Sequence, residues 1–106
     1  MRSDGTRMLQ KINDNDILTV KPEGALDTLT SPEFTAGMEG ELDGIKTLIL
    51  DFEKVPYISS AGVRAILLLQ QTMDNQGSMK LVHVNEDIME LFDTIGFFNV
   101  VTVDND

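Results

Sequence analysis

The stretch Val55-Pro56-Tyr57-Ile58-Ser59-Ser60-Ala61-Gly62-Val63-Arg64 joins the two most strongly patterned parts of this chain. Before it, residues 47–52 (TLILDF) form an apolar run with no polar alternation, which predicts a central strand covered on at least one face and nearly on both. After it, the apolar spacing from residue 61 to about 75 predicts a long helix. A strand that ends, turns at a proline and restarts as a helix places two hydroxyls, those of Ser59 and Ser60, at the start of that helix.

The start of a helix has chemical properties that make these two serines informative. Its first N–H groups lack partners within the helix and carry partial positive charge, so anions bind well there. A serine at this position is by default a capping residue. It is also a place where the fold would tolerate an added phosphate while the surface would change sharply.

The bulk composition is that of one globular domain, residues 1–106, with 42% hydrophobic and 25% charged residues. Residues 1–6 are small and polar, and we expect them to be a disordered tail. No apolar run approaches the roughly 18 residues of a membrane span. The sequence has no cysteine, which excludes disulfides and thiolate chemistry and fits a cytoplasmic protein.

The formal net charge of −10 restricts the class of partner. Nucleic acids need clustered Lys and Arg, and anionic membranes attract basic surfaces, so neither direct nucleic-acid binding nor membrane insertion is expected. A basic protein partner is compatible with this charge, although acidity also serves solubility.

The amino-terminal half predicts a hairpin followed by a helix. Strands are expected at 8–12 and 17–20, joined by a turn at 13–16, and the second strand ends at Pro22 and Gly24. Thr30 and Glu33 have the spacing of a capping box for a helix that stops near Gly44. The buried side of that helix would present Phe34, Met38 and Leu42.

The carboxy-terminal half predicts a strand, a helix and a last strand. We expect the strand at 79–84, after Gly77 has closed the long helix as its C′ residue. Asn85 would cap a third helix that Gly96 closes, with Ile88, Leu91, Phe92 and Ile95 buried, and 98–103 would form the last strand. The whole order, β-β-α-β-α-β-α-β, predicts an α/β fold: a mixed, mostly parallel sheet of four to five strands with three or more helices, mainly on one face.

The helix after the serines has two distinct faces at 100° per residue. The core face carries Gly62, Ala65, Ile66, Leu69 and Met73, flanked by Leu68. The opposite face carries Ser60, Val63, Arg64 and Leu67. Apolar side chains on a face that should be polar have two explanations. In the first, a neighbouring element covers Val63 and Leu67, or they are simply scattered apolar residues on the surface; in the second, they form a docking surface that begins at Ser60.

Signals for catalysis or for a bound ion are weak. The single histidine, His83, lies within an apolar strand pattern and is interpreted as structural. The acidic run at 13–16 lacks the glycine and the distal glutamate of a calcium loop, and we interpret it as a turn. No phosphate-binding glycine loop occurs. We therefore expect no metal, no cofactor and no enzymatic activity.

Three segments together resemble the STAS domains, and more narrowly the bacterial anti-sigma factor antagonists (anti-anti-sigma factors). The central one, residues 50–64, is similar to the family motif of a strand, an Asp-Ser-Ser/Thr-Gly-Leu-type turn and a helix. Gly24-Ala25-Leu26-Asp27 resembles the Gly-x-Leu-Asp that precedes the first helix. Leu91-Phe92-Asp93-Thr94-Ile95-Gly96-Phe97 resembles the Leu-Phe-x-x-x-Gly-Leu segment. The resemblance extends from Met8 over nearly the whole chain.

The resemblance implies a partner-switching protein without catalysis of its own. Such proteins bind an anti-sigma factor that is a serine kinase, are inactivated when the kinase phosphorylates the motif serine, and are reset by a serine phosphatase. By position, Ser60 matches the phosphorylated residue and Gly62 the motif glycine. Asp27 matches an acidic residue near the partner surface.

Two residues depart from the family pattern. Ser59 stands where the family often has aspartate, which makes it the second candidate phosphoacceptor, and Ala61 stands where a hydroxyl is common. The expected partner-binding residues are therefore Asp27, Ser59, Ser60, Gly62, Val63, Arg64 and Leu67, in a monomeric protein. The alternatives are a non-phosphorylated STAS scaffold or regulatory subunit of a transporter or signalling complex, and a STAS sensor of nucleotides or other small ligands.

Overall fold

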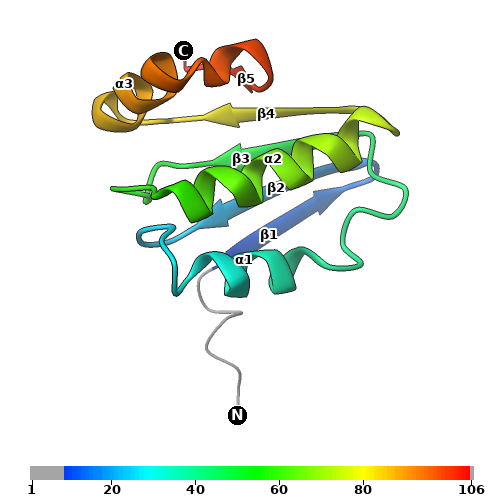
Figure 1. The fold of residues 1–106 in the computed structure, drawn as a ribbon. Coiled ribbons are helices and arrows are strands. Elements are labelled where there is room, and N and C mark those ends of the chain that lie inside the picture. Colours follow the sequence, from blue (N-terminus) through cyan, green and yellow to red (C-terminus); the bar gives the residue numbers. More distant parts are fainter. Residues whose placement is uncertain (1–8, 106) are drawn as a thin grey trace.

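The protein is built on a five-stranded sheet, and the computed structural model describes residues 9–105. The strands lie in the order β1-β2-β3-β4-β5, so each pairs with its neighbours in sequence (Figure 1). β1 and β2 are antiparallel, and the other pairs are parallel. The predicted mixed sheet and element order are thus confirmed. The strands are β1 (Leu9–Asp14), β2 (Ile17–Pro22), β3 (Thr47–Asp51), β4 (Ser78–Val82) and β5 (Thr102–Val103).

The hairpin between β1 and β2 is tighter than the sequence predicts. Asp14 pairs with Ile17, so only two residues form the turn, and Asn15 adopts the left-handed conformation with φ 60°. Asparagine tolerates this conformation better than most residues. The expected start at Met8 and the expected tail at 1–6 lie outside the described residues.

One face of the sheet is buried under helices, and the other is partly open. The residues on the covered face alternate along the strands and are almost fully buried: Leu18, Val20, Leu48, Leu50, Met79 and Leu81. α1 (Ser31–Met38) and α2 (Ser60–Asp74) lie across this face, while α3 (Glu86–Ile95) lies beyond β4 (Figure 1). On the other face Thr47 and Ile49 are half-buried and Asp51 is buried, so the expectation that β3 is covered nearly on both faces holds in part.

α1 is shorter than its apolar spacing predicts. Phe34 and Met38 are buried in the core as expected, but the helix ends at Met38, and Gly40 follows in the left-handed region with φ 77°. Leu42 is still buried, although it lies in the turn that follows. The predicted capping box is also wrong, because no side-chain capping bond from Thr30 is found in the described chain.

α2 ends as expected at Asp74, but Gly77 is not its left-handed C′ residue. No positive φ is found at Gly77, whose amide donates to the Met73 carbonyl of the last helical turn. The need for glycine has a different cause: a Cβ atom there would collide with the backbone carbonyl of Lys46. Gly77 therefore permits a close backbone approach next to the first residue of β4.

α3 begins and ends where the sequence predicts. The Asn85 side chain accepts a hydrogen bond from the Ile88 amide at 2.8 Å, and Gly96 closes the helix with φ 73°. Ile88 and Phe92 are buried, but Ile95 at the end of the expected stripe is 49% exposed.

The segment after α3 and the position of His83 both correct the sequence prediction. Phe97–Asn99 forms a short 3₁₀ helix, and only Thr102–Val103 pair as a strand, so the expected strand at 98–103 is mostly wrong. The Phe97 ring packs on Phe92, with centroids 4.3 Å apart, and this contact holds the chain beside α3. β4 ends at Val82, so His83 lies outside the strand, exposed and with φ 58°.

Candidate functional site

The two motif serines have very different environments. Ser60 is the first residue of α2 and is exposed. Ser59 is the N-cap residue with extended backbone, and its hydroxyl oxygen is buried without a hydrogen-bond partner among residues 9–105. An incoming reagent can therefore reach the hydroxyl of Ser60 and not that of Ser59.

The loop that carries these serines is tied to the segment that carries Asp27. The Leu26 amide donates to the Tyr57 carbonyl at 3.0 Å, and the Ser59 amide donates to the Leu26 carbonyl at 2.8 Å. Isolated bridges pair Glu23 with Lys54 and Leu26 with Ile58. These bonds extend the pairing of β2 and β3 beyond the ends of the strands, and they bring Asp27 to the start of α2.

Gly62 makes this close approach possible. It is buried within the first turn of α2, where a Cβ atom would lie 2.7 Å from the Leu26 carbonyl oxygen and 2.6 Å from Ile58 Cγ1. Any side chain would therefore push the Leu26 segment away from the helix. Gly62 contributes by the space it leaves and offers no side chain to a partner.

The Asp27 carboxylate binds backbone amides in the turn just before α1. Its Oδ1 atom accepts hydrogen bonds from the backbone amides of Leu29 at 2.9 Å and Thr30 at 3.0 Å. The bond from the Thr30 amide is the largest cause that lowers the pKa of Asp27 below its ordinary value of 3.8. The Asp27 side chain thus stabilises the turn that leads into α1 and leaves the helix itself without a side-chain cap from the described residues, and its carboxylate is ionised at neutral pH.

The charge of Asp27 should stabilise the fold in a pH-dependent way. Because its folded pKa is below 3.8, the stabilisation is fully present above that pH and is lost as the pH falls through the folded value. We expect Asp27→Asn, which keeps the acceptor oxygen, to unfold at a lower temperature than the wild-type protein at pH 7. Thermal unfolding monitored by circular dichroism should show the difference shrinking below pH 3.8. A difference that does not change with pH would contradict this role.

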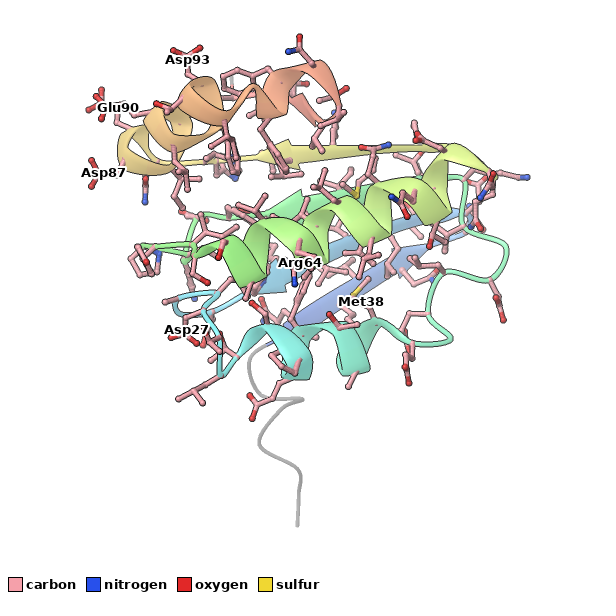
Figure 2. All side chains as sticks on the ribbon, viewed as in Figure 1. Asp27, Met38, Arg64, Asp87, Glu90 and Asp93 are labelled. Carbon is pink, nitrogen blue, oxygen red and sulfur yellow. The ribbon has the colours of Figure 1, made fainter. Side chains whose placement is uncertain are left out.

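The exposed apolar side chain of α2 is not the one expected. Val63 and Leu67 are half-buried and pack against the core, so the first of the two explanations holds for them in part. Leu68, expected to flank the core, is 50% exposed instead. It lies one turn after the exposed Arg64, whose side chain points from α2 toward α1 (Figure 2).

Several hollows adjoin α2. One, of about 380 Å³, has Ser59 and Ser60 in its lining together with Tyr57, Asp87 and Leu91, and we call it the Ser60 hollow. Tyr57 is 57% exposed, and Asp87 points outward from α3 together with Glu90 and Asp93 (Figure 2). The Ser60 hollow thus combines an accessible hydroxyl with apolar surface and one acidic side chain, Asp87.

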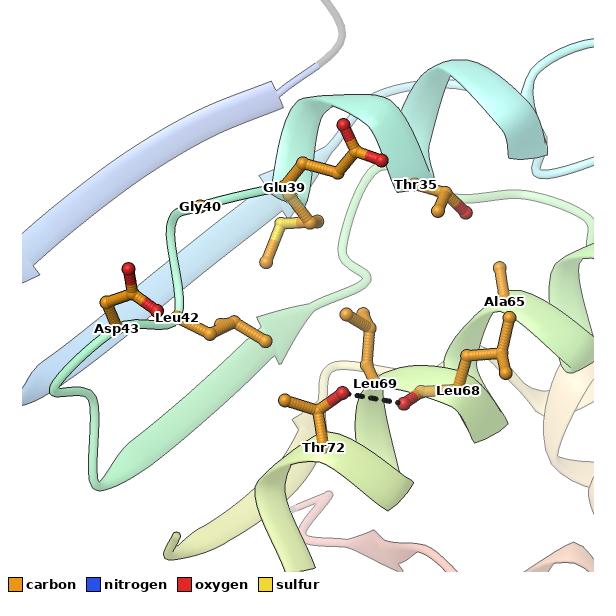
Figure 3. Close-up of a pocket in the computed structure, with 10 residues that line it drawn as sticks. Thr35, Glu39, Gly40, Leu42, Asp43, Ala65, Leu68, Leu69 and Thr72 are labelled. Atoms are coloured by element: carbon orange, nitrogen blue, oxygen red, sulfur yellow. Dashed lines mark hydrogen bonds between the residues drawn. The ribbon is translucent and has the colours of Figure 1, made fainter. Parts of the chain in front are cut away.

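The second hollow lies between α1 and α2 and measures about 270 Å³. Figure 3 shows Leu68 and Leu69 of α2 facing Leu42 and α1 across it, with Glu39 and Asp43 on the other side. A smaller hollow lined by Thr28, Arg64 and Leu68 lies toward the start of both helices. The exposed apolar surface of α2 therefore faces α1, on the side where Arg64 also lies.

Some members of this site could not be identified from the sequence. Tyr57 and Leu91 line the Ser60 hollow. In the sequence they differ from other apolar residues only because they lie in two of the segments that resemble the STAS family. Asp87 lies in the first turn of α3, where an acidic residue favours the helix and so gives no separate sign of a site. The residues that the structure brings together around the start of α2 are Asp27, Ser59, Ser60 and Gly62, as expected, and Arg64 also lies near this end.

Comparison with known proteins gives one family and consistent structural neighbours. The sequence profile of the STAS domain family matches residues 8–106. BtrV of Bordetella bronchiseptica, described as a candidate anti-sigma factor antagonist, is 29% identical over 85 residues, which cover 78% of this chain and 73% of that protein.

Solved structures show that the fold is shared at low sequence identity. A candidate anti-sigma factor antagonist of Thermotoga maritima superposes with a TM-score of 0.86 at 18% identity, covering 98% of this chain and 91% of that one. The phosphorylated form of SpoIIAA, a cell fate determinant of Bacillus, gives 0.69 at 17%, covering 91% and 90%. The murine anion transporter Slc26a9 gives 0.71 at 20%, but the match covers 83% of this chain and 15% of the transporter. Within residues 9–105 of the present chain, every helix is too short or too polar to span a bilayer.

Proposed function

Since the chain belongs to the STAS domain family, we propose that it is an anti-sigma factor antagonist that phosphorylation of Ser60 inactivates. In this proposal it binds an anti-sigma factor that is a serine kinase, in the cytoplasm, and thereby frees the sigma factor. The observation that carries the proposal is the exposed Ser60 at the first position of α2, beside a hollow with apolar lining. The protein has no catalytic step of its own, and a serine phosphatase resets it.

The geometry favours Ser60 over Ser59 as the phosphoacceptor. A kinase must bring the γ-phosphate of ATP within bonding distance of the hydroxyl, which requires an exposed oxygen. Ser60 is exposed, whereas the Ser59 hydroxyl is buried against the loop. A phosphate on Ser60 would also be stabilised by the N–H groups at the start of α2, so the fold accepts the product.

The same position explains how a phosphate would prevent binding. A phosphate adds a charge of about −2 next to apolar contacts that a partner must desolvate. It would also lie close to the nucleotide phosphates of a kinase whose active site faces Ser60, and like charges repel. Tyr57 and Leu91 provide the apolar contacts in the Ser60 hollow, and Asp87 favours a partner that carries basic residues there.

The proposal is tested by mapping phosphorylation after incubation with ATP and the anti-sigma kinase encoded by the same organism. We expect mass spectrometry to find one phosphate on Ser60, with the signal lost in Ser60→Ala and retained in Ser59→Ala. Phosphate on Ser59 alone would move the site by one residue. Absence of phosphate in a folded protein that still binds the kinase would contradict regulation by phosphorylation.

The second candidate function is that of a STAS scaffold or regulatory subunit without phosphorylation. The structural likeness to part of Slc26a9, an anion transporter, favours it, because the STAS fold there is one part of a much longer chain. A stable complex whose affinity does not change with kinase and ATP would support this function over the first.

A further inference from the structure

We propose that Asp51, Glu53 and His83 form a binding site for a divalent transition-metal ion of the Zn²⁺ type. One ligand atom from each of these three side chains lies within 4.8 Å of the others. Asp51 is the last residue of β3, Glu53 lies two residues further along the chain, and His83 directly follows β4. None of them lines the Ser60 hollow.

The distances fit metal coordination. His83 Nδ1 lies 2.9 Å from Asp51 Oδ1. Two atoms that bind one ion at about 2.1 Å lie about 3.0 Å apart at a right angle and about 3.4 Å apart at the tetrahedral angle. The Asp51 and His83 atoms therefore need little movement to share an ion. Glu53 is exposed, and rotation of its side chain can bring a carboxylate oxygen to the same point.

Two of the three ligands are held in place by the fold. The Asp51 side chain is only 8% exposed, and its Oδ1 atom accepts a hydrogen bond from the Glu53 amide at 3.0 Å. His83 adopts a left-handed backbone conformation, φ 58°, which turns its ring back toward β3. An imidazole nitrogen with two carboxylates is a donor set that suits Zn²⁺ with a water as fourth ligand.

Two lysines line the hollow that contains Asp51 and Glu53: Lys54 pairs with Glu23 at 3.2 Å, and Lys21 pairs with Asp51. Lys21 is therefore the cation in direct contact with the proposed site. Its Nζ atom lies 3.9 Å from Asp51 Oδ2, whereas His83 faces the other oxygen of the same carboxylate, Oδ1. The ammonium group neutralises Asp51 when no ion is bound and repels an ion that is bound. Removing this charge should therefore tighten metal binding, which is the opposite of what removing a ligand would do.

The test uses the full chain, free of purification tags, titrated with Zn²⁺ by calorimetry and by NMR of the imidazole signals. Because His83 is the only histidine, its ring signals report on this site alone. We expect one Zn²⁺ to bind per chain and to shift the His83 signals. His83→Asn should weaken binding at least about 100-fold, since a direct ligand is lost. Asparagine tolerates the left-handed backbone at position 83, so this variant folds.

Matched variants separate a built site from general attraction by an acidic surface. Glu53→Gln should weaken binding at least about tenfold. Glu23→Gln, which removes a carboxylate from the same hollow of about 180 Å³, should weaken binding by no more than about threefold because Glu23 is not a ligand and its exposed charge is screened by solvent. Lys21→Met should tighten binding about fivefold.

Three outcomes would overturn the proposal. The first is Zn²⁺ binding that leaves the His83 signals in place. The second is an affinity that is the same in His83→Asn as in the wild-type protein. The third is an equal loss in Glu23→Gln and Glu53→Gln. None of these results bears on phosphorylation of Ser60, so this inference and the proposed function can fail independently.

Discussion

Ser60→Asp is expected to weaken binding to the proposed partner kinase at least about 100-fold, while Ser60→Ala remains within about threefold of the wild-type affinity. The carboxylate would lie at the first position of α2 beside the apolar lining of the Ser60 hollow, where a partner must exclude water. Truncating or charging a desolvated contact commonly costs about 2 to 4 kcal/mol, and about 2.7 kcal/mol corresponds to 100-fold. Isothermal titration calorimetry with the kinase and a non-hydrolysable nucleotide measures the difference.

Ser78→Asp is the matched control for this experiment. Ser78 is exposed at the first position of β4, after the opposite end of α2, so the same change of charge should leave the affinity unchanged. An acidic residue in the first turn of a helix favours the helix, so Ser60→Asp should unfold no earlier than the wild-type protein. Equal affinity of Ser60→Asp and the wild-type protein would contradict gating by charge.

Gly62→Ala is expected to destabilise the fold by about 2 kcal/mol and to lower the unfolding temperature by about 10 °C. The added methyl group would meet the Leu26 carbonyl oxygen at 2.7 Å, and that oxygen cannot withdraw without losing its hydrogen bond from the Ser59 amide. The gain in helix propensity, about 1 kcal/mol, offsets only part of this cost. Chemical denaturation followed by circular dichroism gives the free energy of unfolding.

Gly37→Ala is the control, because it makes the same substitution inside a helix. There the new methyl group would meet only the end of the Leu9 side chain, which can change rotamer. We expect this variant to be as stable as the wild-type protein or slightly more stable. If Gly62→Ala were as stable as Gly37→Ala, the close approach of Leu26 to α2 would not be the reason for glycine at position 62.

The sequence predicts best those parts of the fold whose signals are local. The run at 47–52 and the helical spacing after Ser60 each fall within one element, and both elements form where they are expected. The Asn85 cap and the Gly96 terminus also depend only on residues a few positions apart, and both are confirmed. The position of the motif serines at the start of α2 follows directly from these local signals.

Prediction from the sequence fails where one local preference overrides another, or where segments that are distant in sequence meet in the fold. In α1 the apolar spacing continues to Leu42, but the left-handed conformation at Gly40 is incompatible with a continued helix. The periodicity of α2 separates its faces without revealing which neighbours cover them, so Leu68 and not Leu67 is the exposed leucine. Asp51 and His83 are 32 residues apart and meet only because β3 and β4 pair in register.

The order of the strands has a consequence for how the chain acquires its structure. Each strand in the sheet pairs with the strand that precedes it in sequence, so no pairing has to wait for a segment made much later. Loop closure therefore links neighbouring segments only, which favours rapid folding for a sheet that is mostly parallel. The Ser60 hollow becomes complete only when α3 adds its side, so the proposed partner surface is among the last parts to form.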